Sequence, residues 1–470
     1  MSSEVYDVAV VGSGVIGLFV AYELSKYDVK VIVIDKELEP GFGVSKGHAS
    51  VIHVIQLPFG SVKSILAIYG NKLYDRVARE LNVKLWRVPL LLVAASVKEL
   101  LVAPIVYLIL KLYYGVRGFK VSIVNGRSLR EIEPNVVGFA AVKVEGYGVI
   151  DSFDLIYKLY RACRDRGVRF MFNAVIEDVA VNEDAIVVRT SRGVVKSRFL
   201  VNSAGLYSDM VASMAGGASD TIVPKRGAML VFDKLQVKSI VAPLQFTLSG
   251  ETKGGGIIPT TWGHTIWGPT LSKEGSREDV GVYTRDIRAL YNRFSRLVMV
   301  KGNLIKAYAG VRPSSSKGDF IISYSPRTMR VVNLIGIESP GLTAAPAIAL
   351  IVLWMLKRAG LKLRLRVTTT RRELAISTRD KLVLDPSKVQ GYAGIIICPC
   401  MKVSLADIME AVRSGSTTLD GIMFRTKLGM GSCQGQHCIG RAIVEVLRLT
   451  GVDPEKFVKN RDGSWLVLRS

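Results

Sequence analysis

The sequence predicts an α/β protein with a separate small domain at its C-terminal end, and two patterns lead to this prediction. Residues 7–35, DVAVVGSGVIGLFVAYELSKYDVKVIVID, read as an apolar strand, a glycine-rich turn, a segment of helical period and a second apolar strand. Four of the five cysteines lie between residues 398 and 438, far from this βαβ unit. A chain of 470 residues with 49% hydrophobic composition can bury one large core and still build a smaller one.

The chain is strongly basic, with a formal net charge of +23. Such an excess suits nucleic acid, an anionic membrane surface, or an anionic substrate or partner. Lysines and arginines are scattered along the chain and no nucleic-acid-binding module is present, so we expect no nucleic-acid partner. The first strand begins at Tyr6 with no basic leader before it, which favours a cytoplasmic protein over a secreted one.

The glycine-rich turn has the spacing of a dinucleotide-binding motif. Gly12 makes the tight turn, Gly14 lets the backbone approach a pyrophosphate, and Gly17 lets the helix pack closely on the strand. The N-terminus of the following helix favours an anion. Asp35 ends the second strand, where its carboxylate can accept hydrogen bonds from ribose hydroxyls. The unit therefore predicts dinucleotide binding, but it does not distinguish NAD from FAD.

Six further motifs follow in order along the chain. They are GFGVSKGHASVIH (41–53), FLVNSAGLYSD (199–209), PKRG (224–227), WGPT (267–270), YAGVRP (308–313) and GIESPGLTAA (336–345). Together they resemble the D-amino-acid-oxidase-like superfamily of flavoproteins, in its branch of glycerol-3-phosphate and L-2-hydroxyglutarate dehydrogenases. The resemblance covers about residues 5–360. It implies a Rossmann-like FAD-binding domain interleaved over residues 1–361 with an antiparallel-sheet substrate domain.

The same resemblance implies further FAD-binding positions. Gly341, Leu342 and Thr343 match the turn whose backbone amides contact the flavin ring and its ribityl chain. The positions matched to the ADP half and to the loop around the pyrophosphate and flavin are Gly205, Val175, Ser45 and Ser50.

Oxidation of an alcohol carbon needs a base beside the flavin, because a hydride leaves the carbon while the hydroxyl loses its proton. His53 ends the SVIH motif and matches the family's flavin-side histidine, so it is the preferred base. His48 in the same loop is the alternative, and an orienting role for His53 stays open. We expect His264 to be an exposed residue of a hairpin turn, and His437 to belong with the cysteines.

An anionic substrate needs a fixed cation, and the planar fork of arginine can bind a carboxylate or phosphate with two hydrogen bonds. Arg312 in YAGVRP is the first candidate, because the resemblance places this arginine over the flavin ring. Arg226 in PKRG is the second candidate.

The clustered cysteines have an unusual spacing. Cys398 and Cys400 flank Pro399, and Cys433 and Cys438 follow after a gap of 32 residues. The common zinc sites use two-residue gaps, so this spacing favours another metal or redox site over zinc or disulfides. Pro399 is expected to end the preceding strand in a turn that directs both of its neighbours' thiols inward.

Helices are expected on both sides of the cysteine pairs. Ser404 and Asp407 form a capping-box start for a helix that buries Ile408, Ala411 and Val412. A second helix begins at Cys438, and its expected apolar residues are Ile439, Ile443, Val444 and Leu447.

The segment around GMGSCQGQHC resembles the bacterioferritin-associated ferredoxin fold over about residues 394–450. This resemblance implies a small α-helical domain over residues 393–470 that binds a 2Fe-2S cluster through all four cysteines, Cys398, Cys400, Cys433 and Cys438. Residues 362–392, rich in Thr, Arg and Lys, are interpreted as the linker.

Two apolar segments need a separate interpretation. Residues 99–114, ELLVAPIVYLILKLYY, are apolar nearly all round where relatives have a polar amphipathic helix, and the run is too short to span a bilayer. The segment is either buried in the core or a subunit interface, or it docks on a membrane or a membrane-bound partner. Residues 345–355 are expected to form a core helix.

The expected function is FAD-dependent oxidation of glycerol 3-phosphate to dihydroxyacetone phosphate. We expect electrons to pass from FAD to the cluster and then to an acceptor protein or partner subunit, with little direct reaction with oxygen. One alternative is a dehydrogenase of L-2-hydroxyglutarate, another 2-hydroxy acid or an amino acid, and another is an electron-relay subunit. The expected location is the cytoplasm, with a peripheral contact on the inner face of the membrane left open.

Overall fold

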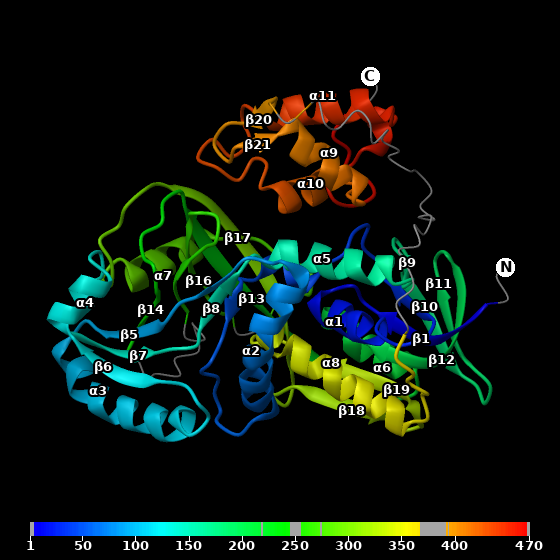
Figure 1. The fold of residues 1–470 in the computed structure, drawn as a ribbon, viewed down its shortest axis with the longest axis horizontal. Coiled ribbons are helices and arrows are strands. Elements are labelled where there is room, and N and C mark those ends of the chain that lie inside the picture. Colours follow the sequence, from blue (N-terminus) through cyan, green and yellow to red (C-terminus); the bar gives the residue numbers. More distant parts are fainter. Residues whose placement is uncertain are drawn as a thin grey trace.

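The computed structural model describes residues 4–217, 220–244, 255–272, 275–366, 392 and 394–467. The chain forms a large sheet with helices packed against it, a second large sheet at the other end, and a small helical lobe carried above both (Figure 1). The predicted α/β class with a small helical C-terminal domain is therefore confirmed.

The first sheet has a parallel centre. Its parallel strands are, in order, β9 (Arg169–Met171), β2 (Val31–Ile34), β1 (Val5–Val11), β12 (Gly193–Asn202) and β19 (Thr328–Ile335). The antiparallel strands β10 (Ile176–Val181), β11 (Ile186–Thr190) and β18 (Ile321–Ser325) extend it. Strand β2 is a continuous apolar run buried on both faces, as expected of a central parallel strand.

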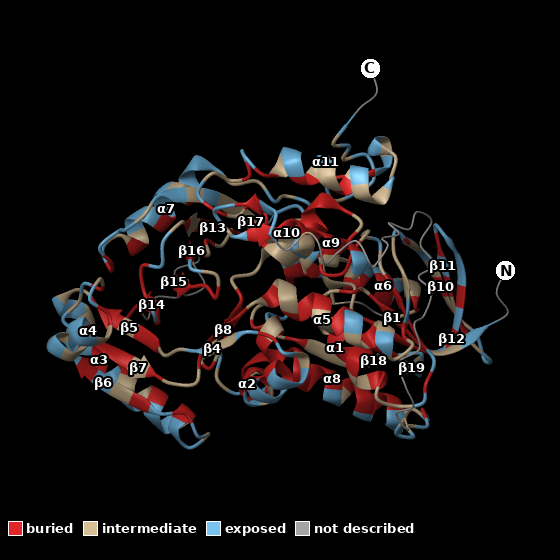
Figure 2. Cartoon of the chain, turned by 45° about the horizontal axis from the view of Figure 1, so that its top comes forward, coloured by how far each residue is buried: buried red, intermediate tan, exposed pale blue. Residues whose placement is uncertain are grey.

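Helices bury the core of this first part. The principal ones are α1 (Val15–Leu24), α2 (Val62–Leu81), α5 (Ser152–Asp165) and α8 (Gly341–Arg358), with the short α6 (Ser208–Met214) and the 3₁₀ turns η1 (Val44–Gly47) and η3 (Gly205–Tyr207). Residues 345–355 lie in α8, which packs on α1 and α2, so the prediction of a core helix is confirmed (Figure 2). Among the described helices, α8 is the one with the length and composition to cross a membrane, and 67% of that window is buried in the protein.

The second sheet forms the wall opposite α1 and α8. Its strands are, in order, β17 (Leu304–Ser315), β13 (Ile222–Phe232), β16 (Thr265–Gly268), β15 (Gly256–Pro259), β14 (Ile240–Pro243), β5 (Leu90–Ala94), β7 (Ala140–Val144) and β6 (Val121–Asn125). All neighbours are antiparallel except β14 and β5, so the predicted antiparallel sheet contains one parallel pair. The flanking elements are α3 (Val97–Leu110), the π-helical turn η2 (Lys111–Gly115), α4 (Gly126–Ile132) and α7 (Thr284–Phe294).

A small three-stranded sheet joins the two large ones. It consists of β3 (Val51–Ile52), β8 (Gly148–Ile150) and β4 (Leu85–Arg87). Strand β3 leads directly to His53, so this sheet sets where the predicted base enters the space between the two large sheets.

The apolar segment 99–114 forms most of α3 and η2. Ala103, Val106 and Leu110 are buried, whereas Leu101 and Ile105 are exposed. Of the alternatives left open by the sequence, burial in the core therefore holds for one side of the helix alone, because a helix packed against one side of a sheet can bury only one of its faces.

The C-terminal lobe contains β20 (Ile396–Cys398), β21 (Val403–Ser404), α9 (Leu405–Arg413), α10 (Leu419–Thr426), α11 (Ile439–Thr450) and η6 (Pro454–Lys456). The predicted capping box at Ser404 is confirmed, and α9 buries Ile408, Ala411 and Val412. The predicted face of α11 is partly wrong: Val444 is exposed, while Ala442 and Val446 are buried. Most of the predicted linker, at residues 367–391, lies outside the described residues.

The lobe is held on the first domain by a buried carboxylate. Glu39 accepts hydrogen bonds from the backbone N–H groups of Thr417 and Thr418, both at 2.8 Å, from the Thr418 hydroxyl at 2.7 Å and from the Tyr157 hydroxyl at 3.0 Å. Thr418 is the N-cap of α10, so the carboxylate also lies at the positive end of this helix. A Cβ at Gly421 would lie 2.2 Å from a Glu39 oxygen, so the helix end can approach only through a glycine.

We predict that Glu39→Ala loosens the lobe without unfolding the first domain. The substitution leaves four donors without their acceptor, which costs on the order of 2–3 kcal/mol. Backbone amides at the start of α10 should then exchange hydrogen faster, which mass spectrometry measures. Glu410→Ala is the matched control, because the Arg161–Glu410 ion pair across the same interface is exposed and contributes less than about 1 kcal/mol. Equal exchange rates in the two variants would contradict the prediction.

Candidate active site

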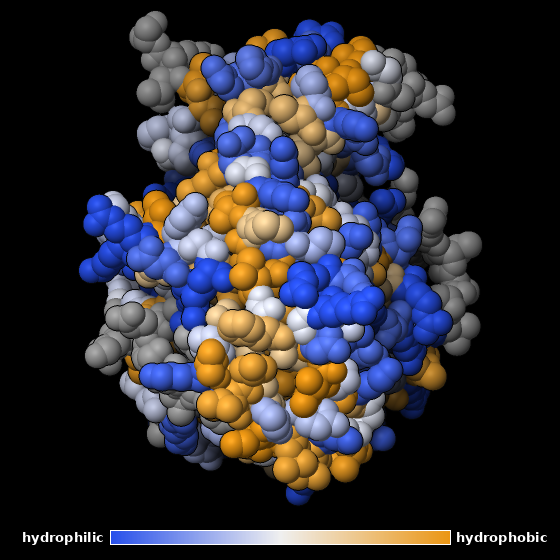
Figure 3. Space-filling model, turned by 90° about the vertical axis from the view of Figure 1, so that its left-hand side faces the viewer, coloured by the Kyte–Doolittle hydropathy of each residue, from blue (hydrophilic) through white to orange (hydrophobic). Residues whose placement is uncertain are grey.

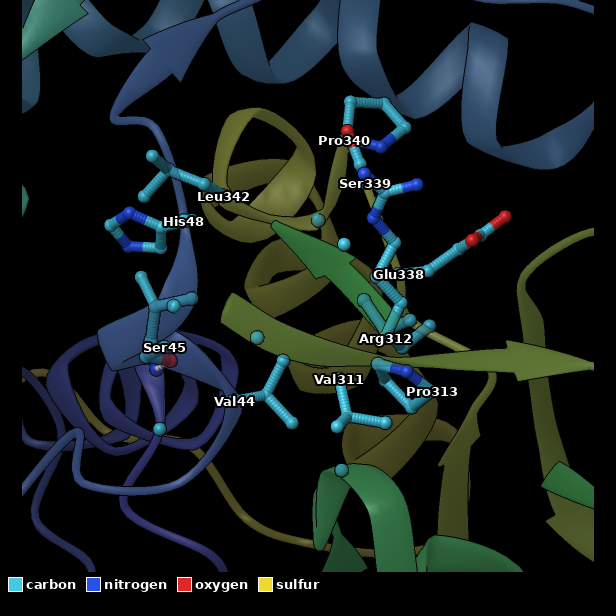
Figure 4. A pocket seen from close by; sticks show the side chains of 18 of the residues that line it. Val44, Ser45, His48, Val311, Arg312, Pro313, Glu338, Ser339, Pro340 and Leu342 are labelled. Atoms are coloured by element: carbon cyan, nitrogen blue, oxygen red, sulfur yellow. Dashed lines mark hydrogen bonds between the residues drawn. The ribbon is translucent and has the colours of Figure 1, made fainter. Parts of the chain in front are cut away.

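A cavity of about 1760 Å³ lies between the two large sheets. Its wall is formed by segments far apart in the sequence, from the glycine-rich turn to β13, β17 and the start of α8. Figure 4 labels wall residues from the loop at 44–48, from β17 and from the turn that leads into α8. Asn460, Arg461 and Ser464 of the C-terminal lobe also line it. The cavity is larger than an ordinary ligand pocket of roughly 300–1,000 Å³, so it has room for a long dinucleotide and a substrate together.

The three glycines of the turn have the geometry that their spacing predicts. Gly12 has φ +97°, and a Cβ there would lie 2.5 Å from the Ser203 carbonyl oxygen. Gly14 lines the cavity as the N-cap of α1, and as a glycine it has no side chain to cap the helix. Gly17 lies behind the cavity wall, where a Cβ would be 1.9 Å from the Gly12 carbonyl oxygen. The turn thus presents bare backbone and a helix N-terminus to the cavity, which is the surface that a pyrophosphate requires.

Asp35 borders the same end of the cavity. Its carboxylate accepts hydrogen bonds from the Ser13 N–H at 2.5 Å, the Ser13 hydroxyl at 2.6 Å and the Glu37 N–H at 2.9 Å. Burial raises the pKa of Asp35, and these hydrogen bonds oppose the shift. The side chain therefore ties the glycine turn to the end of β2 at the border of the cavity.

The remaining predicted FAD-binding residues fall into two groups. Those that line the cavity are Ser45, Ser50, Val175, Gly205, Gly341 and Leu342. Thr343 is buried behind the wall, where its hydroxyl accepts a hydrogen bond from the His53 N–H at 3.0 Å and contacts the Val51 carbonyl. Its side chain holds the His53 loop in place.

Arg312 projects from β17 into the wall of the cavity opposite His48 (Figure 4). Its Nη1 is buried and has no hydrogen-bond partner among the described residues. Burial lowers the pKa of Arg312 and the nearby Glu338 carboxylate opposes this shift, but an arginine stays protonated. The Glu338 carboxylate also accepts hydrogen bonds from the Ser314 hydroxyl at 2.7 Å and from the Lys63 amine at 3.4 Å. The guanidinium thus has donors left for an anion in the cavity.

Both candidate histidines line the cavity. The backbone of His53 is held at both ends, by Thr343 and by the Asn71 amide, which donates to the His53 carbonyl at 2.8 Å. The His53 ring lies edge-on to the Tyr147 ring at 6.0 Å. The two ring nitrogens of His48 are buried without a hydrogen-bond partner among the described residues, and burial lowers the pKa of His48 to about 4. His48 is therefore neutral near pH 7.

Two sequence-based predictions are wrong. Arg226 is not available to a substrate, because its guanidinium is buried against Asp286 at 2.7 Å and Asp279 at 3.4 Å, outside the cavity. His264 lies in the predicted hairpin turn but is buried, since the C-terminal lobe covers the turn and the Met430 backbone hydrogen-bonds to its ring.

Sequence reasoning missed several residues of the site. Glu338 lies inside the GIESPG motif, so a carboxylate beside a matched flavin-contact turn was a usable signal. No such signal marks Lys63, Tyr147 and Arg293, because they reach the site from elements that lie outside the matched motifs. Arg293 lines the cavity, and its Nε is buried without a hydrogen-bond partner among the described residues.

The four cysteines meet in the C-terminal lobe as two pairs. The sulfurs of Cys400 and Cys433 are 3.7 Å apart, and Cys438 shares a hydrogen bond with Cys398. No three His, Cys, Asp or Glu side chains of the described residues are grouped to hold one metal ion. Two pairs of thiols suit two irons with two cysteine ligands each, which is the ligand set of a 2Fe-2S cluster.

Local backbone supports this ligand set. A Cβ at Gly431 would lie 2.4 Å from the Cys400 Cβ, so the two cysteine segments approach closely only through a glycine. Backbone N–H groups of Gly435 and His437 point at the Cys433 sulfur and lower the pKa of its thiol. They favour the thiolate form, which is the form that binds iron. His437 itself is exposed beside the site.

Residues 7–353 match the model of the protein family described as "FAD dependent oxidoreductase". The chain belongs to this family. Residues 396–448 match the BFD-like [2Fe-2S] binding domain, so the cofactors of this oxidoreductase are FAD and a 2Fe-2S cluster. The cavity and the paired cysteines fit these two groups.

Relatives of this oxidoreductase have related activities. A glycerol 3-phosphate dehydrogenase from Caloramator mitchellensis is 29% identical, with 98% of each chain covered. The solved structure of an L-alpha-glycerophosphate oxidase from Mycoplasma pneumoniae with FAD bound has a TM-score of 0.72 at 26% identity, covering 78% of this chain and 97% of that one. An L-2-hydroxyglutarate dehydrogenase from Escherichia coli is 24% identical over 47% of this chain and 53% of its own.

We predict that His48 makes the oxidoreductase less stable in mild acid. The pKa of His48 is about 4 in the folded protein and about 6.5 in an unfolded chain, so between these values only the unfolded chain binds the proton. Stability from this group is therefore lost as the pH falls from about 6.5 towards about 4. The substitution His48→Phe replaces the imidazole with an aromatic ring that cannot titrate. The melting temperature of this variant should therefore fall less than that of the wild type between pH about 7 and about 5. Equal falls in both proteins would show that His48 is not buried in its neutral form.

Proposed function

We propose that this oxidoreductase oxidises glycerol 3-phosphate to dihydroxyacetone phosphate in the cavity and passes the electrons to the cluster of its own C-terminal domain. The observation that carries the substrate proposal is the buried guanidinium of Arg312, which has a donor without a partner among the described residues. A buried cation of this kind needs an anion, and a phosphate oxygen can accept its hydrogen bonds. The relatives that act on glycerol 3-phosphate support a phosphate over a carboxylate.

The residues around Arg312 suit binding and proton removal. The guanidinium binds and orients the phosphate, and apolar side chains such as Leu90, Met229 and Ile258 line the cavity and limit its water. His53 accepts the proton of the reacting hydroxyl at a ring nitrogen, with its backbone held at both ends. Bound FAD supplies the hydride acceptor for the carbon from which that hydroxyl projects.

The position of the C-terminal lobe supports the electron-transfer proposal. Phe424 of α10 stacks on Phe153 of α5, with ring centroids 4.3 Å apart and planes at 8°, and Phe153 lies beside His48 in the cavity wall, at 6.5 Å. Lys427 follows α10 and donates to Asp151 at 3.0 Å. The lobe is thus packed on the wall of the flavin cavity through aromatic rings, and the turn after α10 leads directly to the cysteines.

We predict that Arg312→Met lowers kcat/KM for glycerol 3-phosphate by on the order of 100-fold, because charged hydrogen bonds contribute about 1.5–3 kcal/mol each. Arg312→Lys should recover part of this loss. The measurement is the anaerobic bleaching of flavin absorbance by glycerol 3-phosphate, with the flavin content of each variant as the control for folding.

Other outcomes of this experiment select the alternatives. Bleaching of the wild-type protein by L-2-hydroxyglutarate or an amino acid, and not by glycerol 3-phosphate, would contradict the proposed substrate. Unchanged turnover after alanine substitution of Arg312 or His53 would favour an electron-relay subunit.

We predict that Cys433→Ala removes the cluster and separates flavin reduction from onward transfer. Glycerol 3-phosphate should still bleach the flavin at the wild-type rate, while turnover with a one-electron acceptor falls, because a 2Fe-2S cluster delivers electrons singly. Cys163→Ala is the control, since this cysteine lies in the core of the first domain. Full turnover without the cluster, or rapid peroxide formation by the wild-type protein in air, would contradict electron transfer through the lobe.

A further inference from the structure

The outer side of α3, η2 and the residue that follows η2 carries an apolar surface, here called the α3 face. It consists of Val97, Leu101, Ile105, Leu108, Leu112 and Val116. The exposed fractions of Leu101, Ile105 and Val116 are 73%, 60% and 79%. In the view onto this end of the molecule, hydrophobic side chains gather over its lower part (Figure 3).

The fold itself does not account for the α3 face. The opposite side of the helix, with Ala103, Val106 and Leu110, already packs on the second sheet and completes its core. Folding needs only that inner side, and a polar outer side would be more soluble. An exposed patch of large aliphatic side chains on one helix indicates a surface that docks on something apolar.

The charged residues at positions 97–120 are basic apart from one. Glu99 is the single acidic residue between positions 97 and 120, and it is turned away from the face. Its carboxylate accepts from the Ala95 N–H at 2.7 Å and from Arg296 at 3.1 Å. Lys98 and Lys111 are exposed near the two ends of α3.

We propose that the α3 face docks on an anionic lipid bilayer. The helix would lie in the plane of the membrane, with its aliphatic side chains at the boundary of the acyl chains and Lys98 and Lys111 at the phosphate headgroups. The proposal commits to lipid because the face is a convex helix without carboxylates. A symmetric contact with a second copy would bring the same lysines together with no acidic partner on the face.

Docking in this way places the cavity beside the membrane. Val106 and Leu110, on the inner side of α3, line the cavity, and so does Phe59, whose ring stacks on Tyr113 of η2 at 4.3 Å. The helix that meets the bilayer on one side therefore forms part of the cavity wall on the other.

The test is co-sedimentation of the full-length protein, loaded with FAD and cluster, with vesicles of phosphatidylcholine alone or mixed with phosphatidylglycerol. We expect binding to the anionic vesicles and much weaker binding to phosphatidylcholine. The double variant Leu101→Glu, Ile105→Glu should abolish binding. The double variant Lys98→Glu, Lys111→Glu should weaken it by on the order of tenfold or more, since each lysine near the surface contributes about 1 kcal/mol.

Val194→Glu is the matched control, because Val194 is equally apolar and 50% exposed but lies on β12 of the other sheet. It should bind vesicles like the wild type. All variants should keep their flavin and the wild-type melting temperature, since the changed side chains are exposed. Absence of wild-type binding to anionic vesicles overturns the proposal, and so does unchanged binding of the Leu101→Glu, Ile105→Glu variant. A dimer that this variant converts to monomer, with no vesicle binding, would assign the face to a second copy.

Discussion

The segment from Val44 to His53 is where the parts of the molecule are tied together. The Ser45 hydroxyl accepts from the Val15 N–H at the start of α1, and the Ser50 hydroxyl bonds to Ser152 at the start of α5. Gly47 packs against Gly310 of β17, where a Cβ would lie 2.8 Å from the opposing Cα. The loop is thus held at once by α1 and α5 of the first domain and by β17 of the second sheet. Because it also carries His48 and His53, the position of the chemistry depends on these contacts.

The buried charged side chains of the described residues are of two kinds, those that are fully paired within the protein and those that are not. Arg226 is neutralised by Asp286, and Glu39 is satisfied by four donors at the lobe interface, so both hold elements together. The charge opposite Arg312 is the nearby Glu338 carboxylate, which also binds other groups. The Nη1 donor of Arg312 is buried without a partner among the described residues. A buried charge left partly unpaired is costly in a folded protein. This buried donor is the observation on which the proposed anionic substrate depends.

The C-terminal lobe carries the four cysteines and also packs against the rest of the protein. It covers the turn at His264, places Phe424 against Phe153, and contributes Arg461 to the cavity wall. A domain attached only by its linker would have no such shared wall. Flavin site and cluster site are therefore parts of one packed unit, which suits the proposed transfer of electrons within the chain.

The sequence by itself determined the features that depend on neighbouring residues. The βαβ unit, the roles of Gly12 and Gly17, the capping box at Ser404 and the set of four cysteines all follow from short spacings, because turns, caps and strands form from local backbone preferences. Tertiary structure decided the rest. Arg226 and Arg312 look alike in sequence, and only Asp286, sixty positions from Arg226 along the chain, makes one of them structural. The burial of His264 and the exposure of the α3 face likewise depend on which surface packs over each residue, and that is set by contacts distant in sequence.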